Sequence, residues 1–221
     1  MLLVFDLDGT LVDSIHDLAE AASDLSEAHG GARFDDDTVC RMVGEGAAVL
    51  VERVMARAGH AAPPPGALEM FLRLYDQRMF DTTRAYPGVV DTLRALADSH
   101  AMALLTNKPE DSARKVIAHC GLDGFFAHLV FGDGEFPRKP DPAGLRWLMK
   151  QHRASAARTV LVGDSEVDLA TARAGGVRIC LARYGFGFIR VEPATLRGDE
   201  AFLDQPQDLL ALLDRRGQSR L

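Results

Sequence analysis

Two aspartates stand two positions apart directly after a short apolar segment at the start of the chain. Residues 2–5 are Leu-Leu-Val-Phe, and Asp6, Asp8 and Thr10 follow in the pentapeptide Asp-Leu-Asp-Gly-Thr. If the backbone there is extended, Asp6 and Asp8 project to the same side. Paired carboxylates of this kind suit proton transfer or cation binding. Taken alone, the pentapeptide also fits a polar turn that caps a helix.

Polar residues follow two further apolar segments in the same way. Residues 101–105 lead into Thr106 and Asn107, and residues 159–162 lead into Gly163 and Asp164. A short continuous apolar run is typical of a strand that is buried on both faces. Three buried strands are therefore expected to end on side chains that can do chemistry.

The remaining apolar segments alternate with stretches of helical spacing. Strands are expected at residues 2–5, 101–105, 129–131, 159–162 and 177–181. Helical patterns lie between them, for example at residues 89–97. This alternation predicts a parallel sheet that is covered by helices on both faces. Ligands bind such sheets at the carboxyl ends of the strands, where the polar residues fall.

Residues 14–84 interrupt the alternation. The stretch is too long for a simple crossover, contains no convincing strand, and has helical spacing at residues 15–25 and 49–58. A glycine pair at residues 30–31 and three consecutive prolines at residues 63–65 separate these helical patterns. We therefore expect a three-layer α/β core, formed by residues 1–13 and 85–221, with a helical cap domain inserted at residues 14–84.

The composition favours a globular protein that acts on a small ligand. Hydrophobic residues make up 47% of the chain and charged residues 26%, without a long apolar run. The net charge of −7 disfavours nucleic acid and anionic membranes as partners. The three cysteines are scattered, which indicates reduced thiols, and Asp6 comes too early for a signal peptide or membrane span. A cytoplasmic monomer or homodimer is expected.

Four polar motifs occur in order along the chain. They are Asp6-Leu-Asp8-Gly-Thr10, then Thr106-Asn107, then Lys139 before Pro140-Asp141, and finally Gly163-Asp164-Ser165 with Asp168. Together they resemble the four motifs of the haloacid dehalogenase superfamily, over essentially the whole chain. Within that superfamily, residues 6–14 and the segment Val43-Gly-Glu-Gly46 are most similar to the phosphoglycolate phosphatase group. The resemblance implies a Rossmann-like core with an inserted cap.

The resemblance also implies a reaction, the hydrolysis of a phosphate monoester through an aspartyl-phosphate intermediate. Asp6 would attack phosphorus, and Asp8 would protonate the leaving alkoxide and later accept a proton from water. Thr106, the Asn107 backbone amide and Lys139 would hold the phosphoryl oxygens. Lysine occurs only at positions 108, 115, 139 and 150 of this arginine-rich chain, which sharpens the assignment of Lys139.

Electrostatics independently requires a cation or protons at such a site. If the motif aspartates converge, each pair near 4 Å repels by roughly 4 kcal/mol at an effective dielectric of 20. Oxygen ligands without His or Cys suit Mg²⁺. By the resemblance, the metal ligands would be the Asp6 carboxylate, the Asp8 backbone carbonyl and Asp164. The supporting residues would be Thr10, Ser165 and Asp168.

The preferred substrate is 2-phosphoglycolate, and the cap offers residues that could recognise it. Gly44 lies in the segment Arg41-Met-Val-Gly44-Glu-Gly46, which is either a substrate-specifying loop that faces the active site or a turn between helices. Arg41 or Lys108 could pair with the substrate carboxylate. The segment Tyr184-Gly-Phe-Gly187 is expected to form a mobile loop near the mouth of the site.

Other activities use the same scaffold, and several remain open. Dehalogenation would not need Asp8, and residues 14–84 lack the lysine that phosphonate hydrolysis in this superfamily requires. A sugar phosphomutase acting on β-glucose phosphate shares the core motifs, as does a phosphatase for another small metabolite. From a different class, a phospho-aspartate signalling domain would be shorter and uncapped. A catalytically silent binding protein is the remaining alternative.

Overall fold

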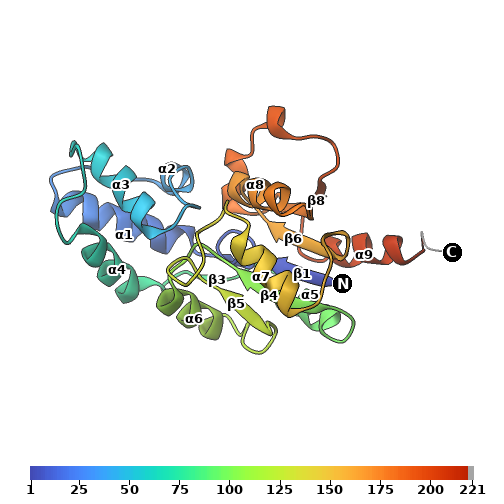
Figure 1. Cartoon of the computed structure of the whole chain (residues 1–221). Coiled ribbons are helices and arrows are strands. Elements are labelled where there is room, and N and C mark those ends of the chain that lie inside the picture. The colour runs from blue at the N-terminus through green and yellow to red at the C-terminus, as the bar shows by residue number, and fades with distance from the viewer. Residues whose placement is uncertain (219–221) are drawn as a thin grey trace.

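A computed structural model describes residues 1–218 and is built around one parallel sheet (Figure 1). The six strands have the order β5-β4-β1-β6-β7-β8, and every neighbouring pair is parallel. They are β1 (Leu2–Phe5), β4 (Ala101–Leu105), β5 (His128–Val130), β6 (Thr159–Gly163), β7 (Arg178–Ala182) and β8 (Ala201–Leu203). The α/β fold class and the five expected strands are confirmed. The sixth, β8, was not predicted.

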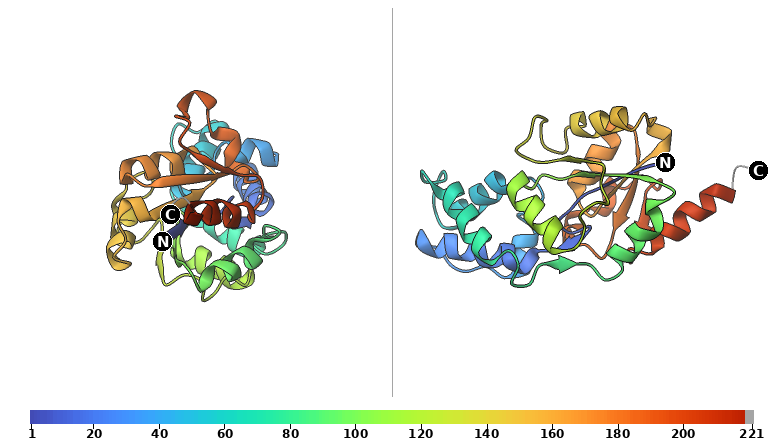
Figure 2. Two further views of the ribbon diagram at one scale, coloured as in Figure 1. Left: turned by 90° about the vertical axis from the view of Figure 1, so that its right-hand side faces the viewer. Right: turned by 90° about the horizontal axis from the view of Figure 1, so that it is seen from below.

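Alternate residues of the central strand β1 enter two separate apolar layers. Leu3 and Phe5 pack into one layer, whereas Leu2 and Val4 pack into the other. Helices α5 (Val89–Ala97), α6 (Glu110–His119) and α9 (Asp208–Gln218) cover the first face, and α7 (Ala143–Gln151) and α8 (Glu166–Gly175) cover the second (Figure 2). Burial on both faces explains why the strand sequences are continuously apolar.

Four helices lie together at one side of the sheet, on the left in Figure 1. They are α1 (Ile15–Ala28), α2 (Asp36–Cys40), α3 (Ala47–Arg57) and α4 (Ala67–Arg78). The chain leaves and re-enters the core through a two-stranded antiparallel ribbon, β2 (Val12–Asp13) and β3 (Arg84–Ala85). Neither short strand was predicted, and β3 begins within the stretch expected to be strand-free. The division into core and cap at residues 14 and 84 stays a prediction.

The returning segment is fastened to α1 by a buried carboxylate. Asp17 is only 1% exposed and accepts hydrogen bonds from the backbone and hydroxyl groups of Thr82 and Thr83, at 2.6–3.1 Å. Burial raises the pKa of Asp17, but these hydrogen bonds outweigh burial and hold the pKa below its usual range. The carboxylate therefore fixes the place where the helical segment rejoins the core.

The helices are short and bury one face each. The 14-residue helix α1 buries Leu18, Ala22 and Leu25, which recur at helical spacing. Across residues 1–218, none of the helices combines the length and the apolar character needed to cross a bilayer.

Candidate active site

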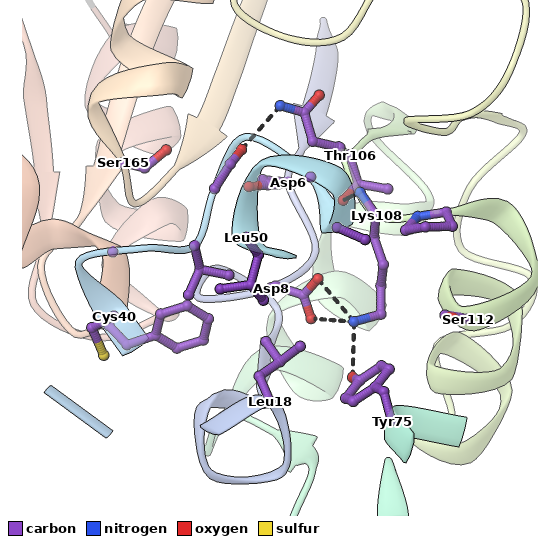
Figure 3. Close-up of a pocket in the computed structure, with 18 of the residues that line it drawn as sticks. Asp6, Asp8, Leu18, Cys40, Leu50, Tyr75, Thr106, Lys108, Ser112 and Ser165 are labelled. Carbon is purple, nitrogen blue, oxygen red and sulfur yellow. Dashed lines mark hydrogen bonds and ion pairs between the residues drawn. The ribbon is translucent and has the colours of Figure 1, made fainter. Parts of the chain in front are cut away.

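The carboxyl ends of three adjacent strands bring the predicted polar residues to one edge of the sheet. Strand β1 lies between β4 and β6, and the Asp6 backbone N–H donates to the Val162 carbonyl at 2.9 Å. Asp6, Thr106 and Asp164 follow these strands directly, and all three line one cavity of about 70 Å³ (Figure 3). Such a volume holds several water molecules or one small ligand.

Asp6 combines one anchored oxygen with one that has no protein partner. Its Oδ1 accepts a hydrogen bond from the Leu7 backbone N–H at 2.8 Å and pairs with Lys139 Nζ at 2.8 Å. Among residues 1–218, no protein group donates a hydrogen bond to its Oδ2. Burial raises the pKa of Asp6 to about 7, while the charge of Lys139 opposes that rise. Oδ2 is thus the oxygen available for reaction.

Three buried aspartates converge around Lys139. Carboxylate oxygens of Asp6, Asp164 and Asp168 lie within 4.8 Å of one another. Lys139 Nζ lies 2.8 Å from Asp6 and 2.7 Å from Asp168, and Thr10 Oγ1 donates to Asp164 at 3.1 Å. Burial, followed by the charges of Asp168 and Asp6, raises the pKa of Asp164 well above its ordinary value.

This cluster fits a hard divalent cation. Three carboxylates face one ammonium, so the fully ionised group carries an excess of two negative charges. Its donors are all oxygens, which suits Mg²⁺. Asp168 already accepts hydrogen bonds from the Ser165 backbone and hydroxyl at 3.1 and 2.6 Å, besides its contact with Lys139. Asp6 and Asp164 therefore have more capacity than Asp168 for binding a metal directly.

Asp8 also lines the cavity, where Lys108 holds its carboxylate. Both oxygens of Asp8 lie 3.1 Å from Lys108 Nζ, and one also accepts a hydrogen bond from Ser14 Oγ at 2.7 Å. Lys108 Nζ donates in addition to the hydroxyl of Tyr75 on α4, at 2.9 Å (Figure 3). Burial lowers the pKa of Lys108, but the contacts with Asp8 and Tyr75 raise the pKa by more than burial lowers it. Lys108 therefore stays charged. One ammonium thus links Asp8 to helix α4.

Asn107 uses its side chain in a way that the sequence did not predict. Only its backbone amide was assigned a role, in binding phosphoryl oxygens. Its side-chain Oδ1 accepts a hydrogen bond from the Lys139 backbone N–H at 2.8 Å, and Nδ2 donates to the carbonyls of Lys139 and Gly44 at 3.0 Å each. Asn107 therefore fixes the backbone of Lys139 and joins it to the loop that contains Gly44.

Two glycines allow the backbone to approach Asp164 closely. The Gly187 N–H donates to Asp164 Oδ2 at 2.7 Å. Gly9 has φ +83°, and a Cβ there would collide with the Asp164 carboxylate. Residues 184–187, predicted as a loop near the mouth of the site, pack against Asp164, and Tyr184 donates to the Thr10 carbonyl at 2.9 Å. Gly187 of this segment therefore contacts Asp164 directly through its backbone N–H.

The structure brings the predicted residues together, with the exception of Arg41. Thr10 and Lys139 contact aspartates of the site and Asp168 belongs to their cluster, although these three residues do not line the cavity. Arg41 is exposed and does not line the cavity, whereas Gly44 and Lys108 do. Arg41 is the residue that caps the C-terminus of α2, and this position turns it to solvent. It is therefore left out of the proposed site.

The sequence interpretation missed Tyr75 and the apolar wall that the helices contribute. That wall is formed by Leu18, Ala47, Leu50, Phe71 and Leu72. Their only signal in the sequence is helical spacing, which marks a core residue and a cavity residue alike. Cys40 also lines the cavity, but burial raises the pKa of its thiol to about 12, which keeps the thiol protonated near neutral pH.

Known proteins resemble this chain over most of its length. Residues 3–182 match the family described as haloacid dehalogenase-like hydrolase. The phosphoglycolate phosphatase of Pseudomonas syringae pv. syringae is 40% identical over 191 residues, covering 84% of this chain and 70% of that protein. A plasmid phosphoglycolate phosphatase of Cupriavidus necator is 39% identical over 214 residues, covering 96% and 92%. The crystal structure of a predicted phosphoglycolate phosphatase from Haemophilus somnus matches with a TM-score of 0.85 at 28% identity, covering 96% and 97%.

Proposed function

The chain belongs to the haloacid dehalogenase-like hydrolases, and we propose that this phosphatase hydrolyses 2-phosphoglycolate, using Mg²⁺ and a phosphorylated Asp6. The observation that carries the proposal is the position of Asp6. Asp6, with its partner-free oxygen, lines a small cavity that Asp8 and Asp164 also line, and Asp164 lies within 4.8 Å of Asp6. The names of the relatives support the choice of substrate.

The proposed reaction has two steps. In the first, Oδ2 of Asp6 bonds to phosphorus, the bond to the leaving oxygen breaks, and Asp8 gives that oxygen its proton. In the second, water attacks phosphorus, Asp8 takes a proton from the water, and the bond between Asp6 and phosphorus breaks to release phosphate. Thr106 and the Asn107 amide would bind the phosphoryl oxygens. Lys139, paired with Asp6, would offset negative charge beside them.

The magnesium ion would be held by Asp6, Asp164 and the Asp8 backbone carbonyl, and would neutralise charge on the phosphoryl group. We expect Mg²⁺ at a hundred times its dissociation constant to stabilise the fold by about 2.7 kcal/mol. For a chain of this size, that corresponds to a rise in Tm of roughly 5–10 °C over EDTA-treated protein. Thermal unfolding with and without Mg²⁺ measures the difference.

A pair of variants tests whether that stabilisation arises at this site. Asp164→Asn should lose most of the Mg²⁺-dependent rise in Tm, because it removes a metal ligand from the buried cluster. Asp123→Asn removes the same charge from an exposed loop and should keep the full rise. A full rise in Asp164→Asn would place the metal elsewhere.

Lys108 is proposed to recognise the carboxylate of the substrate. It is the only lysine or arginine lining the cavity within residues 1–218, and it lies beside Asp8, the residue proposed to protonate the leaving group. In 2-phosphoglycolate the carboxylate is attached to the carbon that bears the leaving oxygen. A cation beside Asp8 would therefore lie near the carboxylate of this substrate.

A screen of phosphate monoesters with Mg²⁺ tests the substrate directly. We expect 2-phosphoglycolate to have a higher kcat/KM than sugar phosphates, nucleotides and p-nitrophenyl phosphate. Lys108→Met should lower kcat/KM for 2-phosphoglycolate about 10- to 100-fold more than for ethyl phosphate, which has no carboxylate. Both substrates release an alkoxide that needs a proton from Asp8, so comparing them cancels any effect of Lys108 on Asp8.

Lys150 on α7 is exposed and supplies the matched control. Lys150→Met should leave the ratio between the two substrates unchanged. If a sugar phosphate or a nucleotide ranks first, the substrate proposal is wrong. If Lys108→Met affects both substrates equally, Lys108 does not recognise the carboxylate.

A further inference from the structure

Arg190 joins the helical segment to the core at the rim of the cavity. It ends the short helix η2 (Phe186–Arg190), which follows β7. Its guanidinium donates to the Val43 carbonyl, to Glu45 at 3.2 Å, and to Glu166 in the first turn of α8. Val43 and Glu45 belong to residues 42–46, which connect α2 to α3 and are called the rim loop below.

The rim loop forms part of the cavity wall. Val43, Gly44 and Gly46 line the cavity from this loop, and Phe186 and Gly187 line it from η2. Gly187 also donates its N–H to Asp164. Arg190 therefore connects two stretches of the wall that lie more than a hundred residues apart in sequence, and one of them directly contacts an active-site aspartate.

The rim loop is braced from its own helix as well. Arg53 on α3 donates to the Met42 carbonyl at 2.8 Å and pairs with Glu45. Burial raises the pKa of Glu45, but hydrogen bonds from Arg53 and Arg190 outweigh it, so the pKa lies below its usual range. Glu45 is thus a carboxylate shared between one arginine of the helical segment and one of the core.

The contacts of Arg190 differ from an ordinary surface ion pair in their burial and in their number. Exposed pairs contribute little because solvent screens them. The Arg190 side chain is only 13% exposed, and it contacts a carbonyl and two carboxylates at the same time. The planar guanidinium has five donors in a fixed arrangement, which a lysine ammonium cannot reproduce.

We propose that Arg190 is a positioning residue that fastens the rim loop over the active site and thereby sets how tightly the substrate is held. The link to substrate rests on the proposed function, because it takes the cavity as the substrate site. If Arg190 is removed, the loop samples detached positions, and the substrate binds only the fraction of molecules in which it is attached. The apparent affinity is then the intrinsic affinity multiplied by that attached fraction, whereas the chemical step in the assembled site is unaffected.

Kinetics and hydrogen exchange test the proposal with the full chain. In Arg190→Ala, backbone amides of residues 42–46 should exchange about tenfold faster in the absence of substrate, consistent with the loss of a charged hydrogen bond. KM for 2-phosphoglycolate should rise about tenfold while kcat stays within about threefold. Arg190→Lys should not restore KM.

Glu45→Gln supplies an independent check on the same contact. Its effect on KM should be less than additive with that of Arg190→Ala in the double variant, because both substitutions remove the contact between Arg190 and Glu45. Arg197→Ala removes an exposed arginine nearby in sequence and should change neither exchange nor KM.

The outcomes separate this proposal from the proposed function. Unchanged exchange of residues 42–46 in Arg190→Ala would show that Arg190 does not fasten the loop. Faster exchange with an unchanged KM would refute the link to substrate binding. If the wild-type protein does not hydrolyse 2-phosphoglycolate, the proposed function fails, and the exchange measurement still decides whether Arg190 holds the loop.

Discussion

Asp6→Asn is expected to abolish turnover, with a loss in kcat of about 10⁴-fold or more. An amide is neither a nucleophile towards phosphorus nor a good ligand for Mg²⁺, so both functions proposed for Asp6 are lost together. The substitution keeps the size of the side chain, and Lys139 retains Asp168 as an ionic partner. The folded structure should therefore survive.

Steady-state kinetics with Mg²⁺ and thermal unfolding together measure this expectation. Asp123→Asn, the same change on an exposed loop, should retain full activity. Acid quenching of the wild-type enzyme during turnover should trap phosphate on the peptide that contains Asp6, and the variant should trap none. Retention of even about one hundredth of the activity by a folded Asp6→Asn protein would contradict its use as a nucleophile.

The sheet could be predicted because both faces of its central strands are buried. Strands with two buried faces appear in the sequence as unbroken apolar runs, and β1, β4 and β6 all have this form. Parallel pairing then places the residues after these strands at one edge, which explains why the sequence predicts that the motif aspartates lie together.

Short elements and contacts between distant segments could not be predicted in this way. The strands β2 and β3 have two residues each and β8 has three, too few to show a period. Tyr75 sits in an ordinary helical pattern, and only the packing of α4 against the core brings its hydroxyl to Lys108. In the same way, only the packing of the helical segment against the core brings the rim loop to Arg190. Such contacts depend on how the helical segment docks, which no local pattern encodes.

Arg41 was predicted to bind the substrate but does not line the cavity. It lies three positions before Gly44 in the sequence, and that proximity suggested a shared role in binding substrate. In the structure α2 ends at Cys40 with Arg41 as its cap residue, and Arg41 faces solvent whereas Gly44, in the following loop, lines the cavity. Closeness along the chain predicts closeness at a site only when the direction of each side chain is known.

The role of Asp8 predicts an effect that depends on the leaving group. Asp8→Asn cannot donate a proton, so we expect kcat/KM for 2-phosphoglycolate to fall about 10²- to 10⁴-fold. The leaving group of p-nitrophenyl phosphate is a stable phenolate that needs no proton. Formation of phosphorylated Asp6 from this substrate should therefore be much less impaired. The second step still lacks its base and should be slow.

These two expectations combine into a visible signature in Asp8→Asn. With p-nitrophenyl phosphate, the variant should release about one equivalent of nitrophenolate per enzyme in a fast burst and then turn over slowly, because the phosphoenzyme accumulates. Stopped-flow absorbance measures the burst, and Asp13→Asn, the same change five residues along the chain, should show none. Equal losses for both substrates without a burst would mean that Asp8 serves mainly to hold Lys108, whose ammonium it contacts through both oxygens. The leaving-group dependence thus distinguishes proton transfer by Asp8 from a purely electrostatic role.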